Sequence, residues 1–179
     1  MSEPGSEAII ELYGAEAIRT RVGQIAGEIA GAGLDNPLIV AVLKGSFIFA
    51  ADLVRALNDQ GLHPEIDFIF LASYGGRTVS SGEVRVLREV ESDLEARDVV
   101  LIDDILDSGR TLAFAKARLE ALGARRVLTC VLVDKRIARA VDIEPDFSGF
   151  VCPDVFVVGY GMDLGNRYRE LPFIGAIEA

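Results

Sequence analysis

Three carboxylates followed by a turn of small residues are the groups in this sequence best suited to chemistry. Asp103 and Asp104 follow four apolar residues, and Asp107 comes three residues later, within the stretch VVLIDDILDSGRTL at residues 99–112. A turn that opens a helix offers backbone amides and the positive end of the helix dipole, which suit an anion such as phosphate. The residues that supply these amides and two hydroxyls are Ser108, Gly109, Arg110 and Thr111.

Adjacent carboxylates repel a phosphate, so Asp103 and Asp104 are expected to face hydrogen-bond donors or a cation. The vicinal hydroxyls of a ribose donate hydrogen bonds, and Mg²⁺ accepts carboxylate ligands while it keeps waters and substrate oxygens. A phosphate site next to a diol or metal site therefore fits a ribose 5-phosphate. For Asp107 there is a simpler alternative, because the residue is also a good N-cap for the helix that follows.

The elements that position these residues are predicted by the spacing of apolar residues. A spacing of three and four predicts a helix over residues 15–30, and Ser46 is expected to cap a helix that runs to Gln60. Apolar runs predict strands, and strands that alternate with helices predict an α/β domain with a largely parallel central sheet. The expected strands are residues 37–43, 65–74, 83–89, 99–102, 126–133 and 155–160, and a third helix is expected at residues 111–122.

Unusual polar residues cluster where these strands end. They are Lys44, Asp103, Asp104, Lys135 and, a few residues past the last strand, Asp163. In parallel sheets, ligands bind outside the carboxyl ends of the strands. The sequence therefore predicts a site at this edge of the sheet.

The composition predicts one acidic domain over residues 1–179. With half of its residues hydrophobic, the chain is long enough for one substantial core and too short for two comfortable domains. A formal net charge of −10 argues against nonspecific binding to nucleic acid or to an anionic membrane. Cys130 and Cys152 form neither a disulfide framework nor a metal-ligand pattern, and the amino terminus resembles no targeting signal, so we expect a cytoplasmic protein with free thiols.

The opening motif resembles the signature of the phosphoribosyltransferases. That signature is an apolar strand, two acidic residues, two apolar residues and then D-[ST]-G-x-T, as found at residues 99–111. Other segments resemble the hypoxanthine-guanine branch in the order of that branch. They are VLKGSFIF at 42–49, SYGG...SSG at 73–82, VDKR at 133–136, PDFSGFVCPDVFVVGYGMD at 145–163 and YRELPFIG at 168–175.

The resemblance implies a type I phosphoribosyltransferase fold with a small hood and a mobile lid loop, GGRTVSSG at residues 75–82. It implies transfer of ribose 5-phosphate from phosphoribosyl pyrophosphate to a 6-oxopurine, with Mg²⁺ as cofactor. Residues 107–111 would bind the 5′-phosphate, and Asp107 would be the general base. Asp103 and Asp104 would bind the ribose hydroxyls or the metal, although many relatives carry Glu at the position of Asp103.

The resemblance also implies roles for residues outside the opening motif. Lys44, Gly45 and Arg169 match pyrophosphate contacts, and Asp163 matches a residue associated with a second Mg²⁺ and the purine pocket. Lys135 would donate to the 6-oxo group. The residues expected at the purine ring itself are Phe156, which would stack on its face, and Val157, whose backbone would bind its edge. Taken alone, Phe156 in so apolar a strand is expected in the core.

Two alternatives stay open. A xanthine-preferring enzyme would share these motifs, because backbone groups read the substituent that distinguishes the purines. A nucleotide-sensing regulatory protein of the same fold would need a basic face for nucleic acid, for which residues 125–126 and 135–139 are the candidates. The resemblance further implies a homodimer or a homotetramer.

Overall fold

The central sheet has six strands in the order β4-β3-β2-β5-β6-β7. The computed structural model describes residues 8–74, 83–136 and 139–178. Only the β3–β4 pair is antiparallel, whereas β2, β3, β5, β6 and β7 pair in parallel. The strands are β2 (Leu38–Leu43), β3 (Glu65–Tyr74), β4 (Glu83–Arg88), β5 (Asp98–Leu106), β6 (Arg126–Lys135) and β7 (Phe147–Cys152). The predicted α/β fold with a largely parallel sheet is confirmed.

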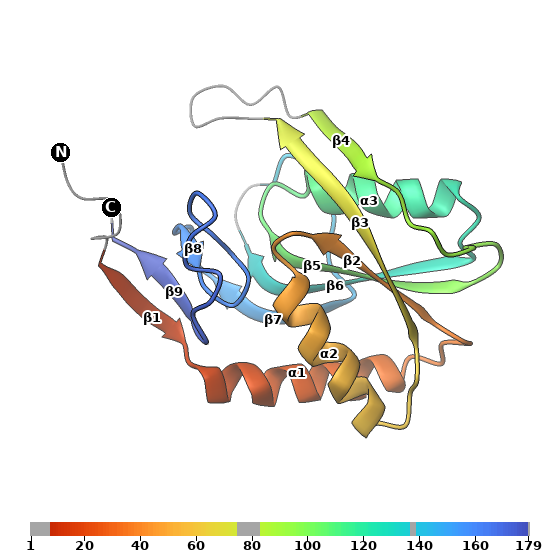
Figure 1. Ribbon diagram of the computed structural model, residues 1–179, viewed down its shortest axis with the longest axis horizontal. Helices are drawn as coiled ribbons and strands as arrows, with labels where there is room; N and C mark the ends of the chain where they lie inside the picture. Colours follow the sequence, from red (N-terminus) through yellow and green to blue (C-terminus); the bar gives the residue numbers. More distant parts are fainter. Residues whose placement is uncertain (1–7, 75–82, 137–138, 179) are drawn as a thin grey trace.

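Helices cover both faces of this sheet (Figure 1). The first face carries α1 (Ala15–Ala30) and α2 (Phe47–Asp59), and α3 (Arg110–Ala121) covers the second. The apolar side of α1 that the sequence predicts is buried through Ile18, Ile25 and neighbouring residues. Each face of the sheet therefore has its own hydrophobic core, and the loops at the carboxyl edge lie between the two layers.

A second, three-stranded sheet with the order β1-β9-β8 forms the predicted small hood at one end of the molecule (Figure 1). Its strands are β1 (Ile9–Tyr13), β8 (Val157–Val158) and β9 (Ile174–Ile177). The strand expected at residues 155–160 is therefore wrong in length. The chain turns after Val158 because Gly159, Tyr160 and Gly161 all have positive φ angles, which no strand accommodates.

Both predicted caps are wrong in detail. Ser46 is at the N-cap position of α2, but its hydroxyl donates to the carbonyl of Val42 at 2.5 Å and does not cap the helix. The N-cap of α3 is Gly109, with φ +80°, so Asp107 lies two residues before the cap. A methyl group on Gly109 would lie 2.7 Å from the Val141 carbonyl, and this close approach explains a glycine there.

Within the described residues, no helix has the length and apolar character needed to span a membrane. Cys130 and Cys152 are buried free thiols, as predicted. The predicted lid, residues 75–82, lies outside the described residues.

Candidate active site

A cavity of about 220 Å³ opens at the carboxyl edge of β2 and β5. Its walls include Gly45 from the β2–α2 loop, Asp103 and Asp104 from β5, and residues 107–109 from the turn before α3. Loops that follow neighbouring parallel strands meet at one edge of a sheet, which explains why residues distant in sequence share this cavity. The cavity lies where the sequence predicts a site.

The two carboxylates lie inside β5 rather than after it, because the strand continues to Leu106. Burial raises the pKa of the Asp103 carboxyl well above its usual range, and the charge of Asp104 raises it further. Burial also raises the pKa of Asp104, while hydrogen bonds with Asp103 and Ile105 and the positive charge of Arg169 act in the opposite direction. The cavity therefore presents two desolvated carboxylates that a cation or hydroxyl donors would stabilise.

This donor set fits a divalent cation that is only partly held by protein. Among the described residues, no three His, Cys, Asp or Glu side chains gather around one metal position. Mg²⁺ commonly takes one or two carboxylates and completes its coordination with waters and substrate oxygens. Asp103 and Asp104 supply two such carboxylates side by side.

The turn between β5 and α3 presents donors to the same cavity. Ser108, Gly109 and Thr111 line it, and the first-turn amides of a helix have no acceptor within the helix. The carbonyl of Ser108 accepts from the amides of Ala140 and Val141 at 3.1 Å, which ties the turn to the segment after β6. The arrangement suits an anion that approaches the amino terminus of α3.

Asp107 is directed toward Lys135, not toward the helix. Lys135 is only 6% exposed at the end of β6, and its Nζ lies 3.5 Å from Asp107 Oδ2 and 3.9 Å from Asp154 Oδ1. Phe156 follows Asp154 by two residues and is 48% exposed, so the alternative that it belongs to the core is wrong, and its stacking on the purine stays a prediction. Val157 is buried and opens β8. An amino group and a carboxylate thus meet here, and an exposed aromatic ring follows two residues after Asp154 in the sequence.

The remaining predicted residues lie in two places: Lys44 and Gly45 follow β2, and Asp163 and Arg169 lie between β8 and β9. Lys44 is exposed, and Gly45 packs so closely on Asp104 that a methyl group would lie 1.8 Å from Oδ2. Arg169 pairs with Asp163 at 2.7 Å and donates to the Gly161 carbonyl at 2.5 Å. Asp163 therefore lies against Arg169, and its metal role stays a prediction.

A family profile described as phosphoribosyl transferase domain matches residues 10–164. The chain belongs to the phosphoribosyltransferase family. The hypoxanthine-guanine phosphoribosyltransferase of Bacillus subtilis is 40% identical over 93% of this chain and 92% of that protein. The bifunctional protein TilS/HprT of Listeria monocytogenes is 46% identical over 80% of this chain, which spans 22% of that longer protein.

Solved phosphoribosyltransferases have the same fold. The hypoxanthine phosphoribosyltransferase of Staphylococcus aureus has a TM-score of 0.86 at 36% identity, covering 94% of this chain and 90% of its own. The Trypanosoma cruzi enzyme, solved in complex with the product IMP, has a TM-score of 0.87 at 36% identity and covers 99% of this chain and 98% of its own. The cavity at the carboxyl edge of β5 is thus the candidate active site of a phosphoribosyltransferase.

Sequence reasoning missed Asp154 and Tyr160. Asp154 lies 3.9 Å from Lys135, and the Tyr160 hydroxyl donates to Asp52 of α2. Neither residue follows a predicted strand end or belongs to a charged cluster. The glycines on both sides of Tyr160 were the one available signal of an unusual backbone there.

Proposed function

We propose that this phosphoribosyltransferase transfers ribose 5-phosphate from phosphoribosyl pyrophosphate to hypoxanthine, guanine or both. The supporting observation is the cavity in which the buried Asp103 and the half-buried Asp104 face the turn that opens α3. In the reaction, the bond from the sugar C1′ to the pyrophosphate oxygen breaks and a bond from C1′ to the purine nitrogen forms. Pyrophosphate leaves with the electron pair, and the nucleoside monophosphate IMP or GMP is the product.

The opening turn of α3 is proposed to hold the 5′-phosphate through its amides and hydroxyls. The residues in this role are Asp107, Ser108, Gly109, Arg110 and Thr111. Asp103 and Asp104 would bind the ribose hydroxyls. Their negative charge would also stabilise the positive charge that develops on the sugar as the pyrophosphate leaves.

The proposed cofactor is Mg²⁺, held by Asp103 and Asp104 together with substrate oxygens, and Asp163 is the candidate for a second ion. When bound, the ion would neutralise charge on the leaving pyrophosphate. Lys44, Gly45 and Arg169 are proposed to bind the pyrophosphate directly. The exposure of Lys44 and the contact between Gly45 and Asp104 support a location beside the sugar site.

At the purine, Asp107 is the proposed general base that accepts the proton from the ring nitrogen. Lys135 would donate to the 6-oxo group, which selects against adenine because an amino group cannot accept that bond. The 3.5 Å approach of Lys135 to Asp107 supports placing both groups at the same base. Phe156 would stack on the ring face, and the backbone of Val157 would bind its edge.

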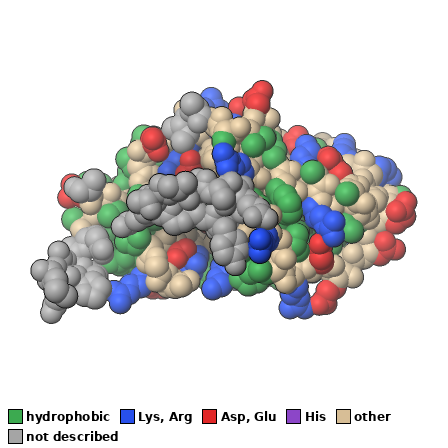
Figure 2. Space-filling model, turned by 90° about the horizontal axis from the view of Figure 1, so that it is seen from above, with side chains coloured by type: hydrophobic (Ala, Val, Ile, Leu, Met, Phe, Trp, Pro, Cys, Tyr) green, Lys and Arg blue, Asp and Glu red, His purple; other side chains and the backbone are tan. Residues whose placement is uncertain are grey.

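Among the alternatives, the regulatory nucleic-acid binder has less support. Arg125 and Arg126 both pair with Asp98, and Arg139 pairs with Asp134 and Glu144. On the visible described surface in Figure 2, Lys and Arg side chains are interspersed with Asp and Glu. The candidate basic residues are thus largely neutralised by their neighbours. A gel shift with RNA at moderate salt is expected to show no complex.

The deciding experiment is a steady-state comparison of guanine, hypoxanthine, xanthine and adenine with Mg²⁺ and phosphoribosyl pyrophosphate. Product from hypoxanthine or guanine and none from adenine is the expected result. Failure to make monophosphate from hypoxanthine or guanine would overturn the proposal, and a higher kcat/KM for xanthine would assign the xanthine-preferring alternative. Chelation of the metal is expected to abolish turnover, and added Mg²⁺ is expected to restore it.

We further propose a single cytoplasmic domain over residues 1–179 that forms a homodimer or a homotetramer. The family resemblance supports this assembly. Light scattering on the protein as it elutes from a size-exclusion column would distinguish a dimer from a tetramer.

A further inference from the structure

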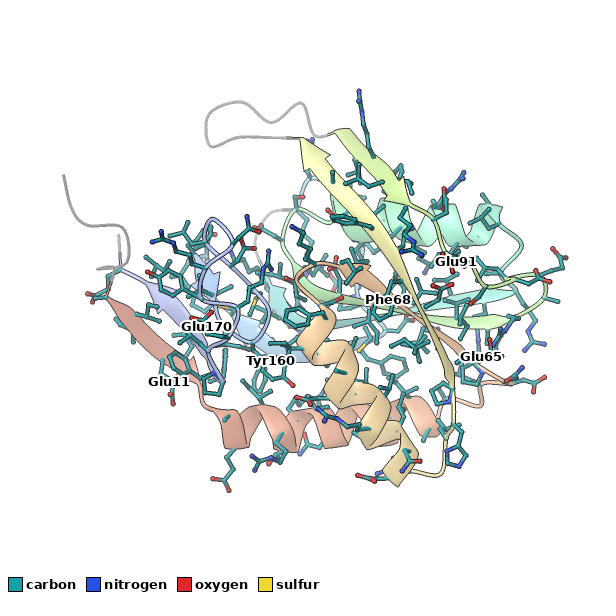
Figure 3. All side chains as sticks on the ribbon, in the orientation of Figure 1. Glu11, Glu65, Phe68, Glu91, Tyr160 and Glu170 are labelled. Atoms are coloured by element: carbon teal, nitrogen blue, oxygen red, sulfur yellow. The ribbon has the colours of Figure 1, made fainter. Side chains whose placement is uncertain are left out.

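Tyr160 connects the hood to helix α2 through a partly buried hydrogen bond. Its side chain is only 7% exposed, and its hydroxyl donates to Asp52, 108 residues away in sequence. Figure 3 shows the labelled Tyr160 between the hood and α2. Burial, together with the bond to Asp52, raises the pKa of the Tyr160 hydroxyl, so it stays protonated and acts as the donor.

The same backbone segment packs directly on the β2–α2 loop. Gly161 has φ +103°, and a methyl group there would lie 2.1 Å from the carbonyl oxygen of Gly45. Gly45 in turn packs on Asp104. A displacement of residues 159–161 would therefore move the backbone at Gly45, because no free space separates the two segments.

Arg169 is held by this segment as well. Its guanidinium donates to the Gly161 carbonyl, and its own carbonyl accepts from the Gly161 amide at 3.0 Å. The Tyr160 amide donates to Leu171 at 2.9 Å. The position of the guanidinium therefore depends on Gly161, the residue that packs on Gly45, as well as on the ion pair with Asp163.

We propose that Tyr160 and Asp52 are positioning residues for the pyrophosphate half of the site. Their hydrogen bond sets the distance between residues 159–161 and α2, and thereby holds Gly45 and Arg169 in the geometry that binds pyrophosphate. The inference rests on the proposed function, in which these two groups contact the leaving pyrophosphate. Within the purine half, Asp107 and Lys135 have no described contact with Tyr160 or Asp52, and Val157, three residues before Tyr160, is held separately by its pairing with Ala176 of β9.

The test compares Tyr160→Phe with the unmodified enzyme. Removal of a hydrogen bond to a carboxylate is expected to raise the KM for phosphoribosyl pyrophosphate and the calorimetric Kd for pyrophosphate with Mg²⁺ by about tenfold. The KM for hypoxanthine at saturating donor is expected to stay within about twofold. A merely structural role would lower Tm without this split between the two substrates.

Tyr13→Phe is the matched control. The Tyr13 hydroxyl donates to the Val151 carbonyl at 2.5 Å, also at the hood but on another element, and its ring stacks on Phe150, which phenylalanine preserves. This control is expected to leave both KM values unchanged. Asp52→Asn keeps an oxygen acceptor and is expected to shift pyrophosphate binding less than Asp52→Ala does.

Three results would overturn the inference: unchanged pyrophosphate binding in both Tyr160→Phe and Asp52→Ala, an equal rise in both KM values, or the same shift in Tyr13→Phe. If Tyr160→Phe does not fold, the inference is tested by comparing pyrophosphate binding in Asp52→Asn and Asp52→Ala. If the unmodified protein binds pyrophosphate but makes no monophosphate, the proposed function fails, while the calorimetric comparison still tests Tyr160.

Discussion

The sequence allows two roles for Asp107, helix cap and general base, and the fold distinguishes between them. As an N-cap it would stabilise α3, but Gly109 occupies that position, and the Asp107 carboxylate lies 3.5 Å from Lys135 instead. The carboxylate is thus available for chemistry without a structural duty at the helix. Substitutions at this residue are expected to act on turnover, not on folding.

The substitution Asp107→Asn is expected to lower kcat by about 10²–10⁴, the usual contribution of a general base. The Kd for phosphoribosyl pyrophosphate should stay within about twofold and Tm should not move, because the variant retains the shape of the side chain. Single-turnover kinetics, calorimetry and thermal unfolding measure these quantities. Equal losses of turnover and donor affinity would instead assign Asp107 to binding.

Lys135→Gln is expected to raise the KM for hypoxanthine by about tenfold, because a neutral and shorter side chain donates more weakly to the 6-oxo group. The KM for phosphoribosyl pyrophosphate should change much less. Lys116→Gln, on α3 and outside the cavity walls, serves as control in the same steady-state assay. A larger effect on the donor than on the purine would contradict the proposed role of Lys135.

At the scale of elements, the site depends on how closely the loop after β2 approaches β5. Gly45 lies against the Asp104 carboxylate, where no larger residue fits without displacement. Gly161 closes the other side of the same loop. The loop is thus held between the central sheet and the hood segment, and its position is a property of three elements together.

Gly45→Ala is expected to raise the KM for phosphoribosyl pyrophosphate by at least about tenfold, since the new methyl group must displace the loop or Asp104. Gly23→Ala is the matched control, because a methyl group at that position of α1 meets nothing within 4 Å. The control should keep the donor KM and gain about 0.5–1 kcal/mol of unfolding free energy from helix propensity. Unchanged donor affinity in Gly45→Ala would show that the loop adapts freely.

At the scale of the whole molecule, an ion cluster joins strands at the edge opposite the site. Asp98, 3% exposed at the start of β5, accepts from Arg125 Nε at 3.0 Å, from the Asp35 amide at 3.0 Å and from Arg126 at 3.2 Å. The hydrogen bond from Arg125 leads the interactions that lower the pKa of Asp98 to about 2. At a pH between about 2 and 4, the Asp98 carboxyl is therefore ionised in the folded protein, whereas the same carboxyl is largely protonated in an unfolded chain.

The sign of the resulting pH dependence follows from this lowered pKa. Asp98 stabilises the folded state fully above its unfolded pKa near 4, and this contribution is lost as the pH falls toward 2. Between pH 5 and pH 3 we expect the free energy of unfolding to fall by about 1 kcal/mol because of Asp98, and Asp98→Asn should not show this fall. Urea unfolding at several pH values measures the difference, and Asp59→Asn, at an exposed residue ending α2, should behave like the unmodified protein.

The sequence alone determined the features that depend on neighbours within a few residues. The periodicity of residues 15–30 and the apolar run of β2 predict their elements closely, because burial of one face requires that spacing. The D-[ST]-G-x-T motif predicts the anion turn for the same local reason. The family resemblance, the largely parallel sheet and the carboxyl edge as the site all follow from such patterns.

Only the tertiary structure decided the features that depend on distant partners. The short strands β1, β8 and β9 exist because they pair with one another across most of the chain. Phe156 is exposed although its neighbours are apolar, and Asp107 meets Lys135 from another strand. The spacing of residues in the sequence does not predict such contacts, because they depend on how whole layers pack and not on the order of residues.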